Sequence, residues 1–171
     1  MSDLLFVTMA GLPGAGKSSI AELLAREFGV CLLELDRIEA PLLERGISGD
    51  TLGWGGYKIL SSLAEDHLSL GHSVILDCVC WTRDLRVQWV ELAHTYRASF
   101  RPIEVVCSDE ALHRSRLSQR RREARGLRNI DWQRVEQARA MYESWDIPRL
   151  QLDSASPLQD LLAQAVTYVR G

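Results

Sequence analysis

A glycine-rich segment ten residues into the chain matches the pattern G-x-x-x-x-G-K-[ST]. It consists of Gly11, Leu12, Pro13, Gly14, Ala15, Gly16, Lys17 and Ser18. An apolar run precedes it and a helical pattern follows, which is the context in which this pattern binds phosphate. Glycines let backbone N–H groups approach phosphate oxygens, and the following helix adds the positive end of its dipole. The segment therefore predicts a site for a nucleoside triphosphate.

Lys17 and Ser18 carry the chemistry expected at the end of this loop. The ammonium group of Lys17 should reach the β- and γ-phosphates, and the hydroxyl of Ser18 should ligate Mg²⁺. Ser19 follows in the first helical turn and completes the expected nucleotide-binding set. The single asparagine, Asn129, has no lysine beside it, so the N-K-x-D motif that reads guanine is absent. We therefore expect ATP and Mg²⁺ as cofactors.

Short apolar runs alternate with segments of helical periodicity. The runs span residues 4–10, 31–36, 73–79, 102–107 and 149–153. The helical segments span residues 18–28, 56–70, 84–97, 109–123 and 156–170. Nearly continuous apolar runs are typical of strands buried on both faces, and βαβ crossovers make such strands parallel. The pattern predicts an α/β fold with a parallel sheet between two layers of helices, and ligands at the carboxyl ends of the strands.

Length and composition predict one domain, residues 1–171, without internal repeats or linkers. No apolar run reaches the roughly 18 residues that a membrane span needs, and the N-terminus lacks the basic residues of a signal peptide, so we expect a cytoplasmic protein. A net charge of −3 disfavours a surface devoted to nucleic acid. The four cysteines lack metal-ligand spacing and are expected to be buried and reduced.

Three acidic residues are expected where the second and third strands end. Asp36 closes the run 31–36, where its carboxylate can face the γ-phosphate and accept the proton of an attacking hydroxyl. Glu34 shares a strand face with Asp36 and would hold water on Mg²⁺. Asp77 ends the apolar part of the third run, where its carboxylate would bind the metal or the acceptor. The structural alternatives are helix capping by Asp36 and a packing role for Glu34.

The phosphate acceptor is expected to bind near residues 37–70 and the loop after the third strand. The candidate contacts are Asp36, Arg37, Trp54, Tyr57, Asp77, Arg83 and Arg86. Arginines suit an anionic acceptor and aromatic rings suit an apolar one. A solvated helix start is the alternative for the two later arginines. The four histidines show neither triad nor metal spacing and are interpreted as surface or packing residues.

An arginine-rich segment, about 116–131, is interpreted as a lid over the nucleotide. Arg116 and Arg120 are four residues apart and share a helix face, from which they would reach the transferring phosphoryl group. A solvated face or a nucleic-acid patch is the alternative. The segment 152–160 follows the last strand and is expected to contact adenine.

With the glycine-rich loop, Asp36, Asp77 and the arginine-rich segment in this order, the chain resembles small P-loop kinases of nucleoside-monophosphate-kinase architecture. It is most similar to AAA-type kinases such as chloramphenicol phosphotransferase-like proteins, 5′-hydroxyl polynucleotide kinases and zeta toxins. Its first third also resembles shikimate kinases. The resemblance implies a five-stranded sheet in the order 2-3-1-4-5, Asp36 as base, and Lys17, Ser18 and the lid arginines on the nucleotide. The segment 78–80 replaces the glycine triplet of shikimate kinases, which disfavours shikimate as acceptor.

The main hypothesis is ATP-dependent phosphoryl transfer to a hydroxyl of a small molecule. Its catalytic residues would be Lys17, Asp36, Arg116 and Arg120. One alternative is a kinase for the 5′-hydroxyl of RNA or DNA, which the arginine-rich segment favours. Another is an ATP-binding regulatory module without transfer. The acceptor's identity and the oligomeric state stay open.

Overall fold

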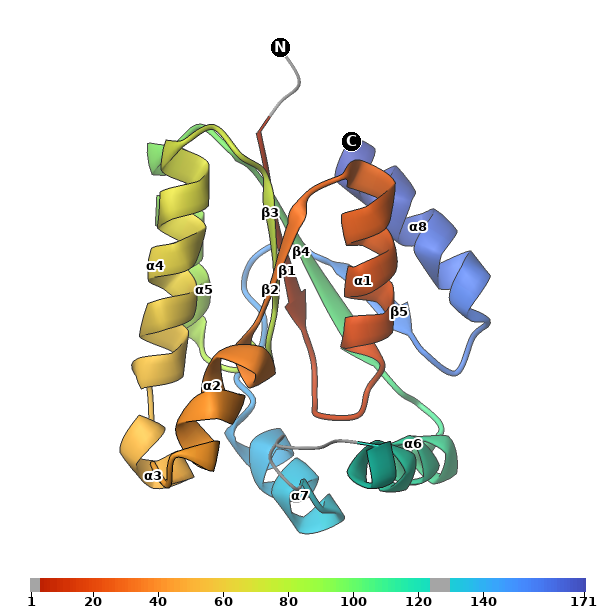
Figure 1. Ribbon diagram of the computed structural model, residues 1–171. Coiled ribbons are helices and arrows are strands. Elements are labelled where there is room, and N and C mark those ends of the chain that lie inside the picture. Colours follow the sequence, from red (N-terminus) through yellow and green to blue (C-terminus); the bar gives the residue numbers. More distant parts are fainter. Residues whose placement is uncertain (1–3, 124–129) are drawn as a thin grey trace.

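The central sheet has five parallel strands in the order β2-β3-β1-β4-β5 (Figure 1). The structure, a computed structural model, describes residues 4–123 and 130–171, apart from the side chains of Asp50 and residues 120–123. In chain order the elements are β1 (Leu5–Ala10), α1 (Lys17–Phe28), β2 (Cys31–Glu34), α2 (Leu35–Glu44), α3 (Gly49–Leu52), α4 (Gly55–Ser69), β3 (Val74–Asp77), α5 (Arg83–Thr95), β4 (Ser99–Val106), α6 (Glu110–Glu123), α7 (Trp132–Met141), β5 (Leu150–Asp153) and α8 (Leu158–Arg170). Both the predicted sheet and its strand order are confirmed.

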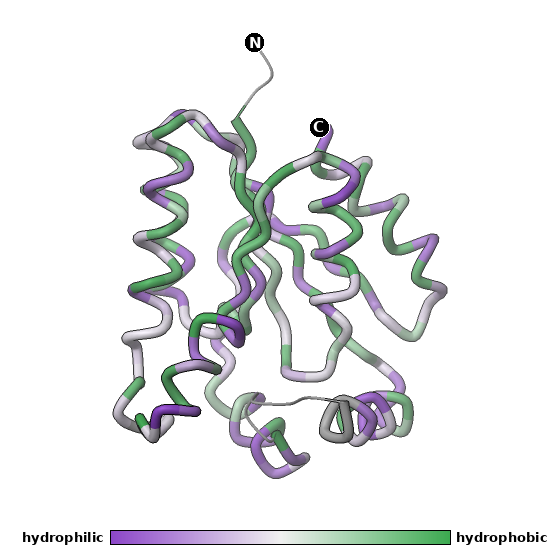
Figure 2. The backbone as a smooth tube through the Cα atoms, viewed as in Figure 1, coloured by the Kyte–Doolittle hydropathy of each residue, from purple (hydrophilic) through white to green (hydrophobic). Residues whose placement is uncertain are grey.

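Helices cover both faces of the sheet, as the apolar runs predicted. α4 and α5 lie on one face, and α1 and α8 lie on the other (Figure 1). The central strand β1 serves both cores because successive side chains point to opposite faces. Phe6 and Ala10 pack in the core under α4 and α5, whereas Val7 and Met9 pack under α1 and α8. The apolar segments accordingly follow the strands at the centre of the molecule (Figure 2).

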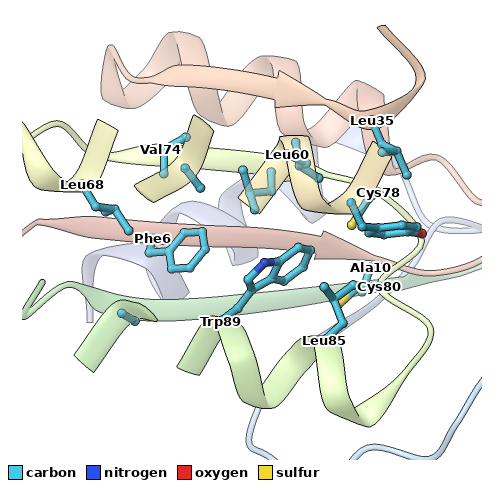
Figure 3. Packing of buried hydrophobic residues seen from close by; sticks show 14 residues of the cluster. Phe6, Ala10, Leu35, Leu60, Leu68, Val74, Cys78, Cys80, Leu85 and Trp89 are labelled. Carbon is cyan, nitrogen blue, oxygen red and sulfur yellow. The ribbon is translucent and has the colours of Figure 1, made fainter. Parts of the chain in front are cut away.

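Trp89 lies fully buried in the core between the sheet and α4 and α5 (Figure 3). Its ring meets Phe6 edge-on at 6.3 Å between centroids, a favoured aromatic geometry. Its indole N–H donates to Ser61 Oγ at 3.0 Å, so the polar atom of this large side chain is satisfied. This core holds α4 and α5 in place beside the carboxyl end of β3.

The second strand is shorter than the sequence predicts. The apolar run 31–36 suggested a strand, but β2 ends at Glu34 and α2 begins at Leu35. Leu35 and Glu39 are buried one helical turn apart, so the residues after Glu34 bury a helical face in place of two strand faces. Asp36 therefore lies in the first turn of α2, where the helix dipole favours a carboxylate.

Arg86 is buried at 1% exposure and binds the backbone of two segments. Its Nε donates to the carbonyl of Cys80 at 3.1 Å. Its terminal nitrogens donate to the carbonyls of Trp81, Glu143 and Ser144 at 2.8 to 3.1 Å. The side chain thus ties the loop after β3 to the segment after α7. The guanidinium of Arg86, which was expected to bind the acceptor, is bound to carbonyl oxygens in the interior.

Arg86→Met should lower the free energy of unfolding by about 3 kcal/mol or more, since it leaves the carbonyls of Cys80, Glu143 and Ser144 without their donor. Arg83→Met is the matched control, because exposed Arg83 pairs with Asp146 at 2.9 Å and such surface pairs contribute about 1 kcal/mol or less. Urea denaturation of both variants measures the difference. Equal losses would contradict a structural role for Arg86.

Candidate functional site

A cleft of about 860 Å³ opens at the carboxyl ends of the strands. The glycine-rich loop and the start of α1 form one wall, and the ends of β2 and β3 with α2 form another. Residues of α6 and of the loop after β5 complete it. Its lining includes Pro13, Gly14, Gly16, Lys17, Ser18, Ser19, Glu34, Asp36, Arg37, Asp77, Arg116 and Ser154. One cleft therefore brings together the predicted nucleotide side and the predicted carboxylates.

The glycine-rich loop leaves β1 at a point where only glycine fits. Gly11 has a φ of 123°, and a Cβ there would lie 2.1 Å from the carbonyl oxygen of Val105. Gly11 N–H donates to the carbonyl of Val79 at 3.1 Å, which fixes the loop against the residues that follow β3. At the other end Gly16, with a φ of 102°, directly precedes α1. The loop therefore delivers the N-terminus of α1 to the cleft, where backbone N–H groups favour an anion.

Lys17 is buried at 8% exposure and folds back over the loop. Its Nζ donates to the carbonyl of Leu12 at 3.0 Å. Ser18 and Ser19 are exposed at the start of α1, and both line the cleft. The loop thus presents an ammonium group and two hydroxyls beside the helix N-terminus, a set suited to a polyphosphate.

Asp77 ends β3 with its carboxylate buried in the same cleft. It lies opposite Met9 of β1 and Glu34 of β2 in the sheet register. Burial raises the pKa of Asp77, and the neighbouring Asp36 and Glu34 raise it further, whereas Lys17 and the Ser18 hydroxyl oppose the increase. Among the described residues, its Oδ1 atom has no hydrogen-bond partner.

These features of Asp77 fit a magnesium site shared with Ser18. Mg²⁺ is held in proteins by one or two carboxylates together with substrate phosphates and water. A buried carboxylate oxygen that lacks a partner, next to a serine at the end of a phosphate loop, matches that donor set. A divalent cation there would also relieve the cost of burying the charge.

Asp36 and Glu34 reach the cleft from the turn between β2 and α2. Asp36 is half-buried and lies close enough to Asp77 to affect its pKa. The Glu34 carboxylate forms an ion pair with Arg37, with 2.9 Å between Oε1 and Nε. The side chain of Arg37 is 73% exposed. Arg37 therefore reaches the cleft already paired to a carboxylate.

Arg116 lines the cleft from α6 and is anchored there. Its terminal nitrogens donate to the hydroxyl and the carbonyl of Ser154, at 2.8 and 3.0 Å. The contact joins α6 to the loop after β5, the segment predicted to contact adenine. The side chain of Arg120 and the predicted lid residues 124–129 lie outside the described residues. The sequence did not predict α7, which begins at Trp132 just after the expected end of the lid.

Several expected acceptor contacts lie elsewhere. Trp54 stacks in parallel on Trp81 at 5.3 Å between ring centroids, and it contacts Tyr57 at the same centroid distance. Tyr57 is buried in the core with Leu35 and Cys78, and this burial raises the pKa of its hydroxyl well above the ordinary value. Neither ring is part of the cleft lining, and neither are Arg83 and Arg86.

The cysteines are all free, but Cys31 and Cys107 are only half-buried.

His113 is a site residue that the sequence interpretation did not single out. It is 2% exposed on α6, and its Nε2 lies 2.7 Å from the carbonyl oxygen of Pro13 in the glycine-rich loop. The available signal was its spacing, because His113 precedes Arg116 by three residues and so shares its helix face. Four residues after His113, Leu117 also packs on the loop, near Gly14.

The sheet order, the glycine-rich loop and the cleft at its end define a P-loop NTPase. The chain belongs to the AAA_33 family, described as an AAA domain, which matches residues 6–144. No curated protein matches the chain significantly. Within the described residues, no helix is both long and apolar enough to cross a membrane.

Solved structures of similar fold include small P-loop kinases. A gluconokinase from Sinorhizobium meliloti 1021 has a TM-score of 0.71 at 19% identity, covering 96% of this chain and 91% of that chain. The APS kinase CysC of Mycobacterium tuberculosis, in complex with AMPPNP and APS, has a TM-score of 0.70 at 20% identity, covering 99% of each chain. Kti12 of Chaetomium thermophilum, in complex with ADP-AlF3, has a TM-score of 0.67 at 18% identity, covering 97% and 100%. At these identities the likeness shows the fold alone.

Asp77→Asn should raise the stability of the nucleotide-free protein at neutral pH. Because the folded-state pKa of Asp77 is raised, its contribution to stability is complete only below the ordinary carboxyl pKa and is lost as the pH rises through the raised pKa. The uncharged asparagine avoids this loss, so its advantage should shrink as the pH falls toward about 4. Thermal unfolding of the variant and the wild type, from neutral pH down to about pH 4, measures this difference in stability.

Asp153→Asn provides a control of opposite sign. A hydrogen bond from the Ser108 side chain lowers the pKa of Asp153, and the N–H groups of Ala155 and Ser108, both at 3.0 Å, lower it further. Its carboxylate therefore stabilises the fold above the ordinary carboxyl pKa and loses this effect as the pH falls. The variant should be less stable than the wild type at pH 7. A destabilised Asp77→Asn at pH 7 would contradict the interpretation of Asp77.

Proposed function

We propose that the protein is an ATP-dependent phosphotransferase that moves the γ-phosphate of ATP to a hydroxyl of a small molecule. The observation that carries this proposal is the shared cleft, in which the P-loop and the carboxylates of Asp36 and Asp77 face one space. The gluconokinase and the APS kinase of similar fold support transfer to small molecules in general.

Lys17, Ser18 and the N–H groups of the P-loop would bind the triphosphate. The Lys17 ammonium, now on the carbonyl of Leu12, is positioned beside the loop and can turn to the β- and γ-phosphates. Mg²⁺ bound by Ser18 and Asp77 would neutralise the charge of the transferring group. Arg116 would contact the nucleotide from α6, beside the loop after β5, and Arg120 would follow on the same helix face.

Asp36 would be the base. Its place in the first turn of α2 puts the carboxylate on the cleft wall that also holds Asp77. An acceptor hydroxyl between Asp36 and the γ-phosphate would lose its proton to the carboxylate while oxygen attacks phosphorus, and ADP would leave. Because Asp77 is buried and Asp36 only half-buried, Asp36 is the better placed of the two to meet an acceptor that enters from solvent.

The charges of the described cleft favour a small acceptor over a polynucleotide. Four carboxylates line it, against three basic side chains, one of which, Arg37, is already paired to Glu34. The carboxylates belong to Glu22, Glu34, Asp36 and Asp77, and the basic side chains to Lys17, Arg37 and Arg116. A nucleic-acid strand would bring further phosphates towards these carboxylates. A polynucleotide kinase is therefore the weaker alternative.

Asp36→Asn should lower the rate of phosphoryl transfer by at least about 100-fold while Mg·ATP binding changes little, since general bases contribute factors of this size. Glu34→Gln is the control, because Glu34 lines the same wall but is already paired with Arg37. It should lower the rate much less. Undiminished transfer by Asp36→Asn would refute its role as base.

Release of ADP, measured by a coupled assay over hydroxylated metabolites, antibiotics, nucleosides and 5′-hydroxyl oligonucleotides, tests the function itself. A small hydroxyl compound that raises ADP release, with no rise for Asp36→Asn, is the expected result. If the acceptor is an oligonucleotide, the affinity of the protein for it should fall steeply as the salt concentration rises. Tight ATP binding without transfer to any acceptor would favour a regulatory module instead.

A further inference from the structure

We infer that His113 is a positioning residue that holds the Pro13–Gly14 peptide of the P-loop in the orientation required for phosphate binding. The inference rests on the nucleotide-binding part of the proposed function and needs no particular acceptor. It starts from the buried contact between the imidazole Nε2 and the carbonyl oxygen of Pro13, at 2.7 Å across 100 residues of sequence. A carbonyl oxygen can only accept, so Nε2 carries the hydrogen and donates it.

The loop around this peptide is a β-turn with two accessible forms. Ala15 N–H donates to the carbonyl of Leu12 at 3.1 Å, which closes a turn over residues 12–15. Pro13 occupies its second position, and Gly14, with a φ of 79°, occupies its third, as in a type II turn. Rotating the peptide between them by about 180° gives a type I turn, which keeps the same closing hydrogen bond. The closing bond alone therefore does not select the orientation of this peptide.

The hydrogen bond from His113 selects one of the two orientations. In a planar trans peptide, the carbonyl of one residue and the N–H of the next point in opposite directions. No described peptide bond is cis, so fixing the Pro13 carbonyl on His113 directs the N–H of Gly14 the other way. A rotated peptide would instead turn this carbonyl oxygen away from its donor.

The two sides of the loop face different cavities. His113 lines a separate cavity of about 400 Å³ behind the loop, together with Leu12 and Ala15. Pro13 and Gly14 line the nucleotide cleft in front of it. The side away from His113 is therefore the side of the phosphates. A carbonyl oxygen turned to that side would repel them, whereas an N–H attracts them.

The imidazole is itself held from several directions. Trp132 of α7 meets the ring edge-on at 5.2 Å between centroids. The guanidinium of Arg114 lies over the same tryptophan, 4.0 Å from its centroid. On the loop side, a Cβ on Gly14 would lie 3.3 Å from the imidazole and 3.2 Å from Leu117, so the ring packs directly on the turn. His113 thus transmits the position of α6 and α7 to one peptide of the loop.

The test compares substitutions of similar length that differ in the donor. Glutamine carries an amide nitrogen near the place of Nε2, whereas methionine fills the space without a donor. Binding of Mg·ADP to the full chain, measured by calorimetry, should stay within about threefold of the wild type for His113→Gln. It should weaken by about tenfold for His113→Met, the factor that corresponds to one hydrogen bond to a charged group. Equal affinities for the two variants would overturn the inference.

A second pair separates positioning from a purely structural role. His113→Asn offers the same amide as His113→Gln but places it near the position of Nδ1, too short to reach Pro13. It should resemble His113→Met in ADP affinity, and this pair serves if the methionine variant does not fold. Unfolding without nucleotide is measured in parallel, and affinity losses that merely follow the loss of folded protein would overturn the inference. A wild type that binds no ADP would instead refute the proposed function.

Discussion

The site depends on the close approach of three backbone segments where β1 ends. The N–H of Gly11 binds the carbonyl of Val79 after β3, while its α-carbon lies against the carbonyl of Val105 in β4. Because β1 pairs with both neighbouring strands, the loop that follows it can leave the sheet only between them. The sheet thereby sets the place of the P-loop, and the P-loop sets the place of α1.

The sequence predicts those parts of the fold that local patterns determine. Apolar runs and the glycine-rich motif were enough for the parallel sheet, the two helical layers and the phosphate loop. The sequence places Asp36 in a strand because the apolar residues Cys31, Leu32, Leu33 and Leu35 hide the start of a helix, which only the burial of Leu35 and Glu39 reveals. Contacts between segments that lie far apart in the sequence could not be predicted either. An arginine in the first turns of a helix that begins with Arg83 and Asp84 looks solvated, yet Arg86 is buried because it binds carbonyls from a segment nearly sixty residues away.

The proposed function and the stability of the fold make opposite demands on Asp77. A buried carboxylate whose Oδ1 has no partner among the described residues is unfavourable for the empty protein, and two neighbouring carboxylates add to that cost. The same desolvation strengthens its attraction for a divalent cation. A stability-optimised sequence would place a neutral residue here, so the aspartate is better explained by what the cleft binds than by what the fold needs.

In the proposed role of His113, α6 and α7 hold the turn at Pro13 and Gly14 independently of the nucleotide. The conformational entropy lost in ordering it therefore belongs to folding and is not subtracted from the affinity for the ligand. Linkage makes this reciprocal, because a nucleotide that needs the ordered turn must also stabilise the packing of Trp132 on His113. Nucleotide binding should accordingly stabilise the packing of α7, whose residues lie behind the loop and outside the cleft.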